Sequence, residues 1–218
     1  MHIFDLTHTI RNSMPVYPGT EPPRFSAACT CAADGFRETK MEMLSHVGTH
    51  IDAPAHIYDG KTPLDAFPAE QFIGRALVID CRHVGEGGRI TMQELAPYGD
   101  AVYQVDFLLF CTGWDQKWGT SAYFGHYPVV DDAVFELILQ GNYKGIGFDH
   151  ISLDPITDTA LTYHHMLFAA KEIINIENLT NLHQLLGDAP VMFACLPIKL
   201  ENADGCPARA VAWREGVL

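Results

Sequence analysis

The pattern of apolar and polar positions divides the chain into short strands and helices. Two runs, 76–80 and 105–111, are almost wholly apolar, which is typical of buried strands. Further strands are predicted at 4–9, 40–46, 145–149, 173–177, 191–199 and 208–215. Helices are predicted from residue 91 to the residue before Pro97, at 131–140, at 161–172, and over a short segment ending near Gly187. Because strands and helices alternate along the sequence, the predicted class is α/β.

Capping and turn residues mark several of these boundaries. The segment 91–94 has the spacing of a capping box, which predicts that a helix begins there. Asp131 or Asp132 is suited to cap the next helix, and Gly141 is suited to end it. The loop that contains residues 203–205 lies between the last two predicted strands, so these strands should form a hairpin.

The composition is that of one folded domain. The chain has 218 residues, of which 48% are hydrophobic, enough for a sizeable core. Charged residues make up 19%, which argues against disorder. Since no repeat, low-complexity segment or linker interrupts the sequence, we expect residues 1–218 to form a single domain.

The net charge and the cysteine content limit the binding partners and the cellular location to be expected for the protein. The formal net charge of −13 disfavours nucleic acid and anionic membranes as partners. No stretch approaches the roughly 20 apolar residues of a membrane span, and residues 1–6 lack the basic start and long apolar run of a signal peptide. The six cysteines include no CxxC pair, which indicates reduced thiols. We therefore expect a cytoplasmic protein that acts on a small molecule.

One segment, 45–56, concentrates side chains that bind transition metals. It contains His46, His50, Asp52 and His56. Imidazole nitrogens and carboxylate oxygens are ligands that divalent transition metals take. A histidine-rich surface loop would explain any one of these residues, but four of them around a single glycine indicate a metal site.

The same segment should be extended with one sharp bend. Its β-branched residues and a proline at its end disfavour a helix. A straight strand would separate residues 46 and 50 by about 13 Å, at about 3.3 Å per residue, too far for metal–ligand bonds of about 2 Å. The chain must therefore bend, and Gly48 has no Cβ to forbid unusual backbone angles. We predict a strand leading in, a kink at Gly48, an extended segment 50–52 and a loop that presents His56.

A family signature coincides with this segment. It reads His46-x-Gly-Thr-His50-x-Asp52-x-Pro54-x-His56, which resembles the signature HxGTHxDxPxH of the metal-dependent hydrolases called the cyclase family. That family includes bacterial kynurenine formamidases and isatin hydrolases. The resemblance extends along the whole chain and implies a swivelling β/β/α domain around a mixed β-sheet. It also implies an oligomer, such as a homodimer or homotetramer.

Three other segments match the family. Tyr17 lies in MPVYPG, which resembles the family's PVWPG, and the resemblance implies that Tyr17 lines the substrate pocket where the family has tryptophan. The alternative is a loop aromatic that packs against the core. Trp114 lies in TGWD, another family segment, and could face the site or, as we favour, pack beneath it. Asp149 and His150 follow a strand that ends near the family's active site, so they could support it.

The resemblance also implies a second group of metal ligands. In the family a histidine near a helix start and a later glutamate complete the metal site. His165 and Glu177 have the family's spacing, and Glu177 opens an ENL segment like that of the family. Asp52 would then bridge to a second ion held by His165 and Glu177. The neighbouring His164 leaves this alignment ambiguous by one residue, and an exposed carboxylate is the alternative for Glu177.

The first metal ion would be bound by His46, His50 and Asp52. Ligands without sulfur allow Zn²⁺, Mn²⁺ or Fe²⁺, and one or two ions. Such an ion polarises a carbonyl group and lowers the pKa of water. His56 has no evident need to be a ligand, and it is placed to move a proton between water and the leaving amine as the catalytic residue.

These features together favour a metal-dependent hydrolase of a C–N amide bond in a small molecule. Arylformamidase activity on N-formylkynurenine is the first named candidate, and hydrolysis of an isatin-type cyclic amide is the second. A cyclase or dehydratase that uses the same metal is a different enzyme class. A non-catalytic metal- or metabolite-binding module is disfavoured because a purely structural site has no use for His56.

Overall fold

The computed structural model describes residues 2–187 and 189–214. Its main sheet consists of β1 (Ile3–Asp5), β4 (His50–Asp52), β5 (Ile73–Asp80), β7 (Phe107–Cys111), β9 (Gly145–Phe148), β10 (Ile174–Glu177), β11 (Val191–Pro197) and β12 (Gly205–Trp213). The order in this eight-stranded sheet is β1-β12-β11-β5-β7-β9-β10-β4. Because β4 also pairs with β12, every strand of this sheet except β1 belongs to a closed, barrel-like ring.

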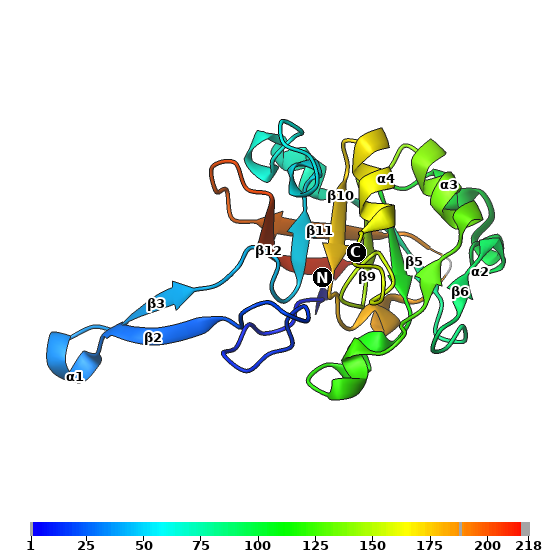
Figure 1. Ribbon diagram of the computed structural model, residues 1–218. Coiled ribbons are helices and arrows are strands. Elements are labelled where there is room, and N and C mark those ends of the chain that lie inside the picture. Colours follow the sequence, from blue (N-terminus) through cyan, green and yellow to red (C-terminus); the bar gives the residue numbers. More distant parts are fainter. Residues whose placement is uncertain (1, 188, 215–218) are drawn as a thin grey trace.

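The ring is mixed, with one parallel side. Strands β5, β7, β9 and β10 are parallel neighbours, whereas β11, β12 and β4 pair antiparallel. The α-helices are α1 (Cys31–Asp34), α2 (Met92–Leu95), α3 (Asp132–Gln140) and α4 (Thr162–Ala170), and α3 and α4 lie beside the parallel strands (Figure 1). The mixed sheet with its helices confirms the predicted α/β class. Within the described ranges, no helix has the length and apolar character needed to cross a membrane.

Short 3₁₀ helices connect many of these elements. They are η1 (Pro54–His56), η2 (Leu64–Ala66), η3 (Ala69–Phe72), η4 (Ala96–Tyr103), η5 (Trp114–Lys117), η6 (Ser121–Phe124) and η7 (Leu182–Leu185). The predicted short helix before Gly187 is the 3₁₀ segment η7.

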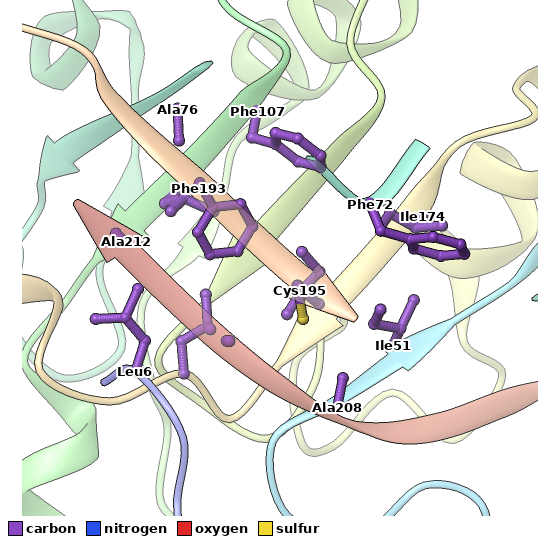
Figure 2. Close-up of a cluster of buried hydrophobic side chains, with 14 of the residues drawn as sticks. Leu6, Ile51, Phe72, Ala76, Phe107, Ile174, Phe193, Cys195, Ala208 and Ala212 are labelled. Carbon is purple, nitrogen blue, oxygen red and sulfur yellow. The ribbon is translucent and has the colours of Figure 1, made fainter. Parts of the chain in front are cut away.

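Two apolar layers hold the ring in place. Inside it, Phe107, Phe193 and Cys195 pack with Ile51 from β4 (Figure 2). Outside it, side chains of β5, β7 and β9 pack against α3 and α4. Alternation along β4 therefore sends Ile51 into the ring while His50 and Asp52 face the other way.

Most predicted boundaries agree with the structure. The capping box at Thr91 is formed, Asp131 caps α3, and Gly141 follows its last residue. The last two strands form the predicted hairpin, but β12 begins earlier, at Gly205. Residue 215, where the prediction ended this strand, lies outside the described residues.

Four strands depart from the sequence patterns. A long hairpin of β2 (Arg24–Cys29) and β3 (Glu38–Glu42), closed by α1, projects from the body as an arm (Figure 1). The predicted strand at 40–46 thus ends at Glu42. Two short strands, β6 (Arg89–Ile90) and β8 (Val129–Val130), form a separate parallel pair that the sequence did not suggest.

Candidate metal centre

The kink at Gly48 brings the first histidines together. Its φ angle is +64°, a left-handed value that favours glycine. The Gly48 carbonyl accepts hydrogen bonds from His50 Nδ1 and from Asn178 Nδ2, both at 2.9 Å. The turn is thereby fixed from two sides, and the predicted bend is confirmed.

Three side chains from this turn and from β4 form a first donor group. His46 Nδ1 lies 2.7 Å from Asp52 Oδ1, and His50 Nε2 lies 3.2 Å from the same oxygen. The ligand atoms of these three residues lie within 4.8 Å of one another. Such spacing suits metal–ligand bonds of about 2 Å to a common ion.

Asp52 also belongs to a second donor group. Its Oδ2 lies 3.3 Å from His164 Nε2, which is itself 3.3 Å from Glu177 Oε1. Strand pairing explains the placement, because Glu177 lies opposite His50 and Asn175 lies opposite Asp52 in the β10–β4 ladder. Glu177 is buried rather than exposed, so the alternative of a solvent-facing carboxylate does not hold.

The side-chain amide of Asn175 fixes the orientation of the two carboxylates of this second group. Asn175 Nδ2 donates to Asp52 Oδ2 and to Glu177 Oε1, each at 2.9 Å. The backbone N–H of Leu153 donates to Glu177 as well, also at 2.9 Å. These carboxylates are therefore oriented before any ligand arrives.

The second ring nitrogen of each histidine has an acceptor of its own. His46 Nε2 lies 2.9 Å from Asp204 Oδ2, and His164 Nδ1 lies 2.6 Å from Asp154 Oδ2. His50 Nδ1 has the Gly48 carbonyl already described. Histidines that ligate metals usually donate their other N–H to such a carboxylate or carbonyl.

The electrostatics of the centre also suit a cation. Burial disfavours the charged form of His46, yet its hydrogen bonds to Asp204 and Asp52 raise its pKa to about 10. Burial likewise opposes protonation of His164, but hydrogen bonds to Asp154, Asp52 and Glu177 raise its pKa well above the usual value. The surrounding carboxylates thus attract positive charge, and the nitrogen and oxygen donors fit a divalent transition metal.

The structure corrects one predicted ligand. His165 is exposed, and its Nδ1 lies 3.2 Å from the Tyr58 hydroxyl. Consecutive residues point about 100° apart on a helix, so His164 and not His165 shares the inward face of α4 with Leu167 and Phe168. The second donor group is therefore Asp52, His164 and Glu177.

This correction makes a direct prediction. His165→Ala should leave the metal content unchanged, because its ring lies outside both donor groups. His164→Ala should lower the metal content by removing a ligand from the second group. Elemental analysis of the two purified variants checks both outcomes, and a loss of metal in His165→Ala alone would restore the original assignment.

His56 lies over the centre without belonging to the two groups that share Asp52. Its ring centroid is 3.9 Å from that of His46 and 6.0 Å from that of His164. Burial is the main cause that lowers the pKa of His56 to about 4, so the imidazole is neutral at pH 7. A neutral imidazole beside the donor groups can accept a proton.

A cavity of about 300 Å³ opens above the donor groups. Its lining includes the apolar parts of Tyr17, Leu44 and Ile151 as well as the donors and His56. Burial and the charges of Glu177 and Asp154 raise the pKa of Tyr17, so its phenol stays protonated near neutral pH. The cavity can therefore hold a small, partly aromatic molecule against the metal donors.

Other candidates from the sequence lie behind the cavity. Trp114 is buried, and its indole N–H donates to the Tyr123 carbonyl, so it packs beneath the site. His150 is fully buried between Tyr127 and Phe148. Asp149 accepts hydrogen bonds from the loop that begins at Thr112. None of these three candidates lines the described cavity.

Sequence reasoning missed four polar residues that support the centre. Asn175 and Asn178 hold its carboxylates and its turn, and Asp154 and Asp204 hold its histidines. Asn178 follows Glu177 in the ENL segment, and its position there was a usable signal. The two aspartates are single acidic residues in loops, and no local spacing distinguishes them from solvent-exposed acids.

Comparison with known proteins decides the family. A family model described as "Putative cyclase" matches residues 4–155. A kynurenine formamidase from Geobacillus thermodenitrificans (strain NG80-2) is 32% identical over 215 residues, which cover 97% of this chain and 97% of that relative. The chain belongs to the cyclase family.

Solved structures resemble this cyclase-family chain over nearly its whole length. Isatin hydrolase A from Labrenzia aggregata, bound to benzyl benzoate, matches with a TM-score of 0.86 at 24% identity. The match covers 99% of this chain and 94% of the isatin hydrolase chain. A structure described as a "predicted metal-dependent hydrolase" from Bacillus stearothermophilus has a TM-score of 0.77 at 25% identity and 97% coverage of both chains. The expected enzyme class, a metal-dependent hydrolase of amide bonds, is confirmed for this family member.

Proposed function

We propose that this chain is an arylformamidase that uses bound divalent metal to hydrolyse the formamide of an aromatic small molecule such as N-formylkynurenine. The observation that supports this most is the position of Asp52. It belongs to two donor groups and lines a cavity whose lining also includes apolar side chains. The kynurenine formamidase relatives favour this substrate over others.

The donor groups would hold one or two ions. His46, His50 and Asp52 would bind the first, and Asp52, His164 and Glu177 the second. Zn²⁺ and Mn²⁺ both suit nitrogen and oxygen donors without sulfur. When bound, such an ion supplies a Lewis acid that polarises the amide carbonyl and lowers the pKa of water.

The remaining side chains would position the substrate and move the proton. His56, neutral and close to both donor groups, would take a proton from the attacking water and deliver it to the leaving amine. Tyr17, Leu44 and Ile151 would pack against the aromatic ring of the substrate. The scissile bond would then lie between these apolar side chains and the metal donors.

A substrate comparison tests the proposal. The protein is stripped of metal with a chelator, reloaded with Zn²⁺ or Mn²⁺, and assayed with N-formylkynurenine and with isatin. We expect metal-dependent release of formate from N-formylkynurenine at the higher kcat/KM. If isatin is opened at the higher kcat/KM, the protein is a cyclic-amide hydrolase and not an arylformamidase. If neither compound is turned over with metal bound, the result favours a cyclase or dehydratase, or a non-catalytic binding module.

We also propose that the chain forms a homodimer through its arm. An isolated two-stranded hairpin is marginally stable in water, yet β2 and β3 have few contacts of their own with the body (Figure 1). Two large apolar side chains of the arm, Phe36 and Met41, are 55% and 62% exposed. A second copy of the chain would cover them and stabilise the hairpin.

The arm makes the dimer testable. Phe36→Glu with Met41→Glu should shift the protein from dimer to monomer in multi-angle light scattering, because it places charge in the apolar contact. Tyr103→Glu is the matched control, since Tyr103 is also exposed but lies in η4, outside the arm. A wild-type monomer, or a double variant that remains dimeric, would contradict the proposal.

A further inference from the structure

We propose that Asp204 is a positioning residue that aims the His46 ring at the metal and keeps His56 beside it. This inference rests on the proposed function, because it assumes that the donor groups bind metal. Asp204 lies in the loop between β11 and β12 and comes from the far end of the sequence. Its side chain nevertheless lies within reach of both histidines.

The backbone of Asp204 is fixed close to the donor strand. Its carbonyl accepts a hydrogen bond of 2.9 Å from the Ala53 N–H, directly after β4. The preceding carbonyl, of Ala203, accepts one of 2.9 Å from the Leu64 N–H. The first of these bonds extends the β12–β4 pairing, in which Gly205 lies opposite Asp52, and the second ties the loop to η2. The backbone that carries the Asp204 carboxylate is therefore held in place by hydrogen bonds.

The next residue leaves room for the His46 ring. A Cβ on Gly205 would overlap that ring, and the ring atoms are the nearest neighbours of this position. His46 thus packs closely against the backbone at the start of β12, with Asp204 at its Nε2. The ring is held by a surface on one side and by a hydrogen bond at its edge.

The hydrogen bond also decides which nitrogen of His46 faces the centre. Asp204 Oδ2 lies 2.9 Å from Nε2 and can accept its N–H, so Nδ1, which lies 2.7 Å from Asp52 Oδ1, is the nitrogen left to bind a metal ion. Carboxylates that orient a ligating histidine in this way typically contribute about 10–100-fold to metal affinity or activity. Asp204 has the position of such a carboxylate.

His56 is the second histidine in reach. Its Nδ1 lies 3.8 Å from the same Asp204 oxygen, and Ser45 Oγ donates to that oxygen at 3.2 Å. The side chain of Asp204 is 48% exposed, so it stands between the centre and solvent. The carboxylate therefore lies beside both imidazole rings, where it can restrict the position of the His56 ring over the centre.

The test measures metal affinity without substrate. Asp204→Asn keeps the size of the side chain but removes its charge, and Glu201→Gln makes the same change at an exposed site of the same loop. Zn²⁺ affinity is measured by competition with a chromogenic chelator. We expect Asp204→Asn to lower the affinity about 10–100-fold and Glu201→Gln to leave it unchanged. Equal affinity in all three proteins would overturn the inference, whereas a wild type that binds no metal would overturn the proposed function itself.

Two further measurements separate positioning from general destabilisation. Gly205→Ala keeps the carboxylate but displaces the His46 ring, so it should also weaken Zn²⁺ binding while thermal unfolding of the metal-free protein changes little. At saturating Zn²⁺, Asp204→Asn should lower kcat in the wild type but add little to His56→Ala, because both act on the same proton transfer. Fully additive effects on kcat would mean that Asp204 acts only on the metal ligand His46. That result would contradict the part of the inference that concerns His56.

Discussion

Replacement of Asp52 by alanine should remove bound metal and hydrolytic activity together. Asp52 contributes one carboxylate oxygen to each donor group, so its loss breaks both at once. It also leaves His46 and His164 without an acceptor that each now has. We expect elemental analysis to find little metal, and activity to fall to the background.

The control for this variant is an exposed acid from the same part of the chain. Asp59→Ala removes a carboxylate shortly after η1 and should retain metal and rate. Thermal unfolding of the two metal-free variants shows whether Asp52→Ala is folded. A folded Asp52→Ala protein with a full complement of metal would show that the ion is held elsewhere.

His56→Asn should keep the fold and the metal but lower kcat by about 10²–10⁴-fold, the usual contribution of one general acid or base. That loss corresponds to about 3–5 kcal/mol of barrier, at 1.36 kcal/mol for each tenfold change. Asparagine can form hydrogen bonds but cannot carry the proton from the attacking water to the amine. The expected signature is a lower kcat with metal content unchanged.

An exposed histidine serves as the control for this second variant. His126→Asn changes an imidazole on the surface and should have the wild-type kcat. Loss of metal from His56→Asn together with its activity would make His56 an ordinary ligand. Normal turnover would assign the proton transfer to another group.

The sequence predicted best where one local rule decides the structure. The capping box at Thr91 and the cap at Asp131 depend only on nearby backbone N–H groups, and both are formed. The bend at Gly48 followed from the reach of two histidines. Each of these features is determined by a few consecutive residues.

The sequence-based predictions were wrong or incomplete where contacts between distant segments determine the structure. The HH pair differs by a single helical position, and only the packing of α4 on the ring shows that His164 faces inward. Asp204 becomes part of the centre because β12 pairs with β4, a contact between segments that are far apart in the sequence. The arm has exposed residues on both faces of β3, so its sequence lacks the alternation that marks a half-buried strand.

Closure of the ring at β4 has a consequence for the order of events during synthesis. Strand β4 is made long before its two neighbours, β10 and β12, which come much later in the sequence. Until then His50 and Asp52 lie on a three-residue strand with no partner on either edge. A nascent chain that ends before Gly205 lacks the β12 side of this strand, so the complete centre can assemble only after β12 has been made. Capture of metal by the complete centre should therefore follow the pairing of β4 with β10 and β12.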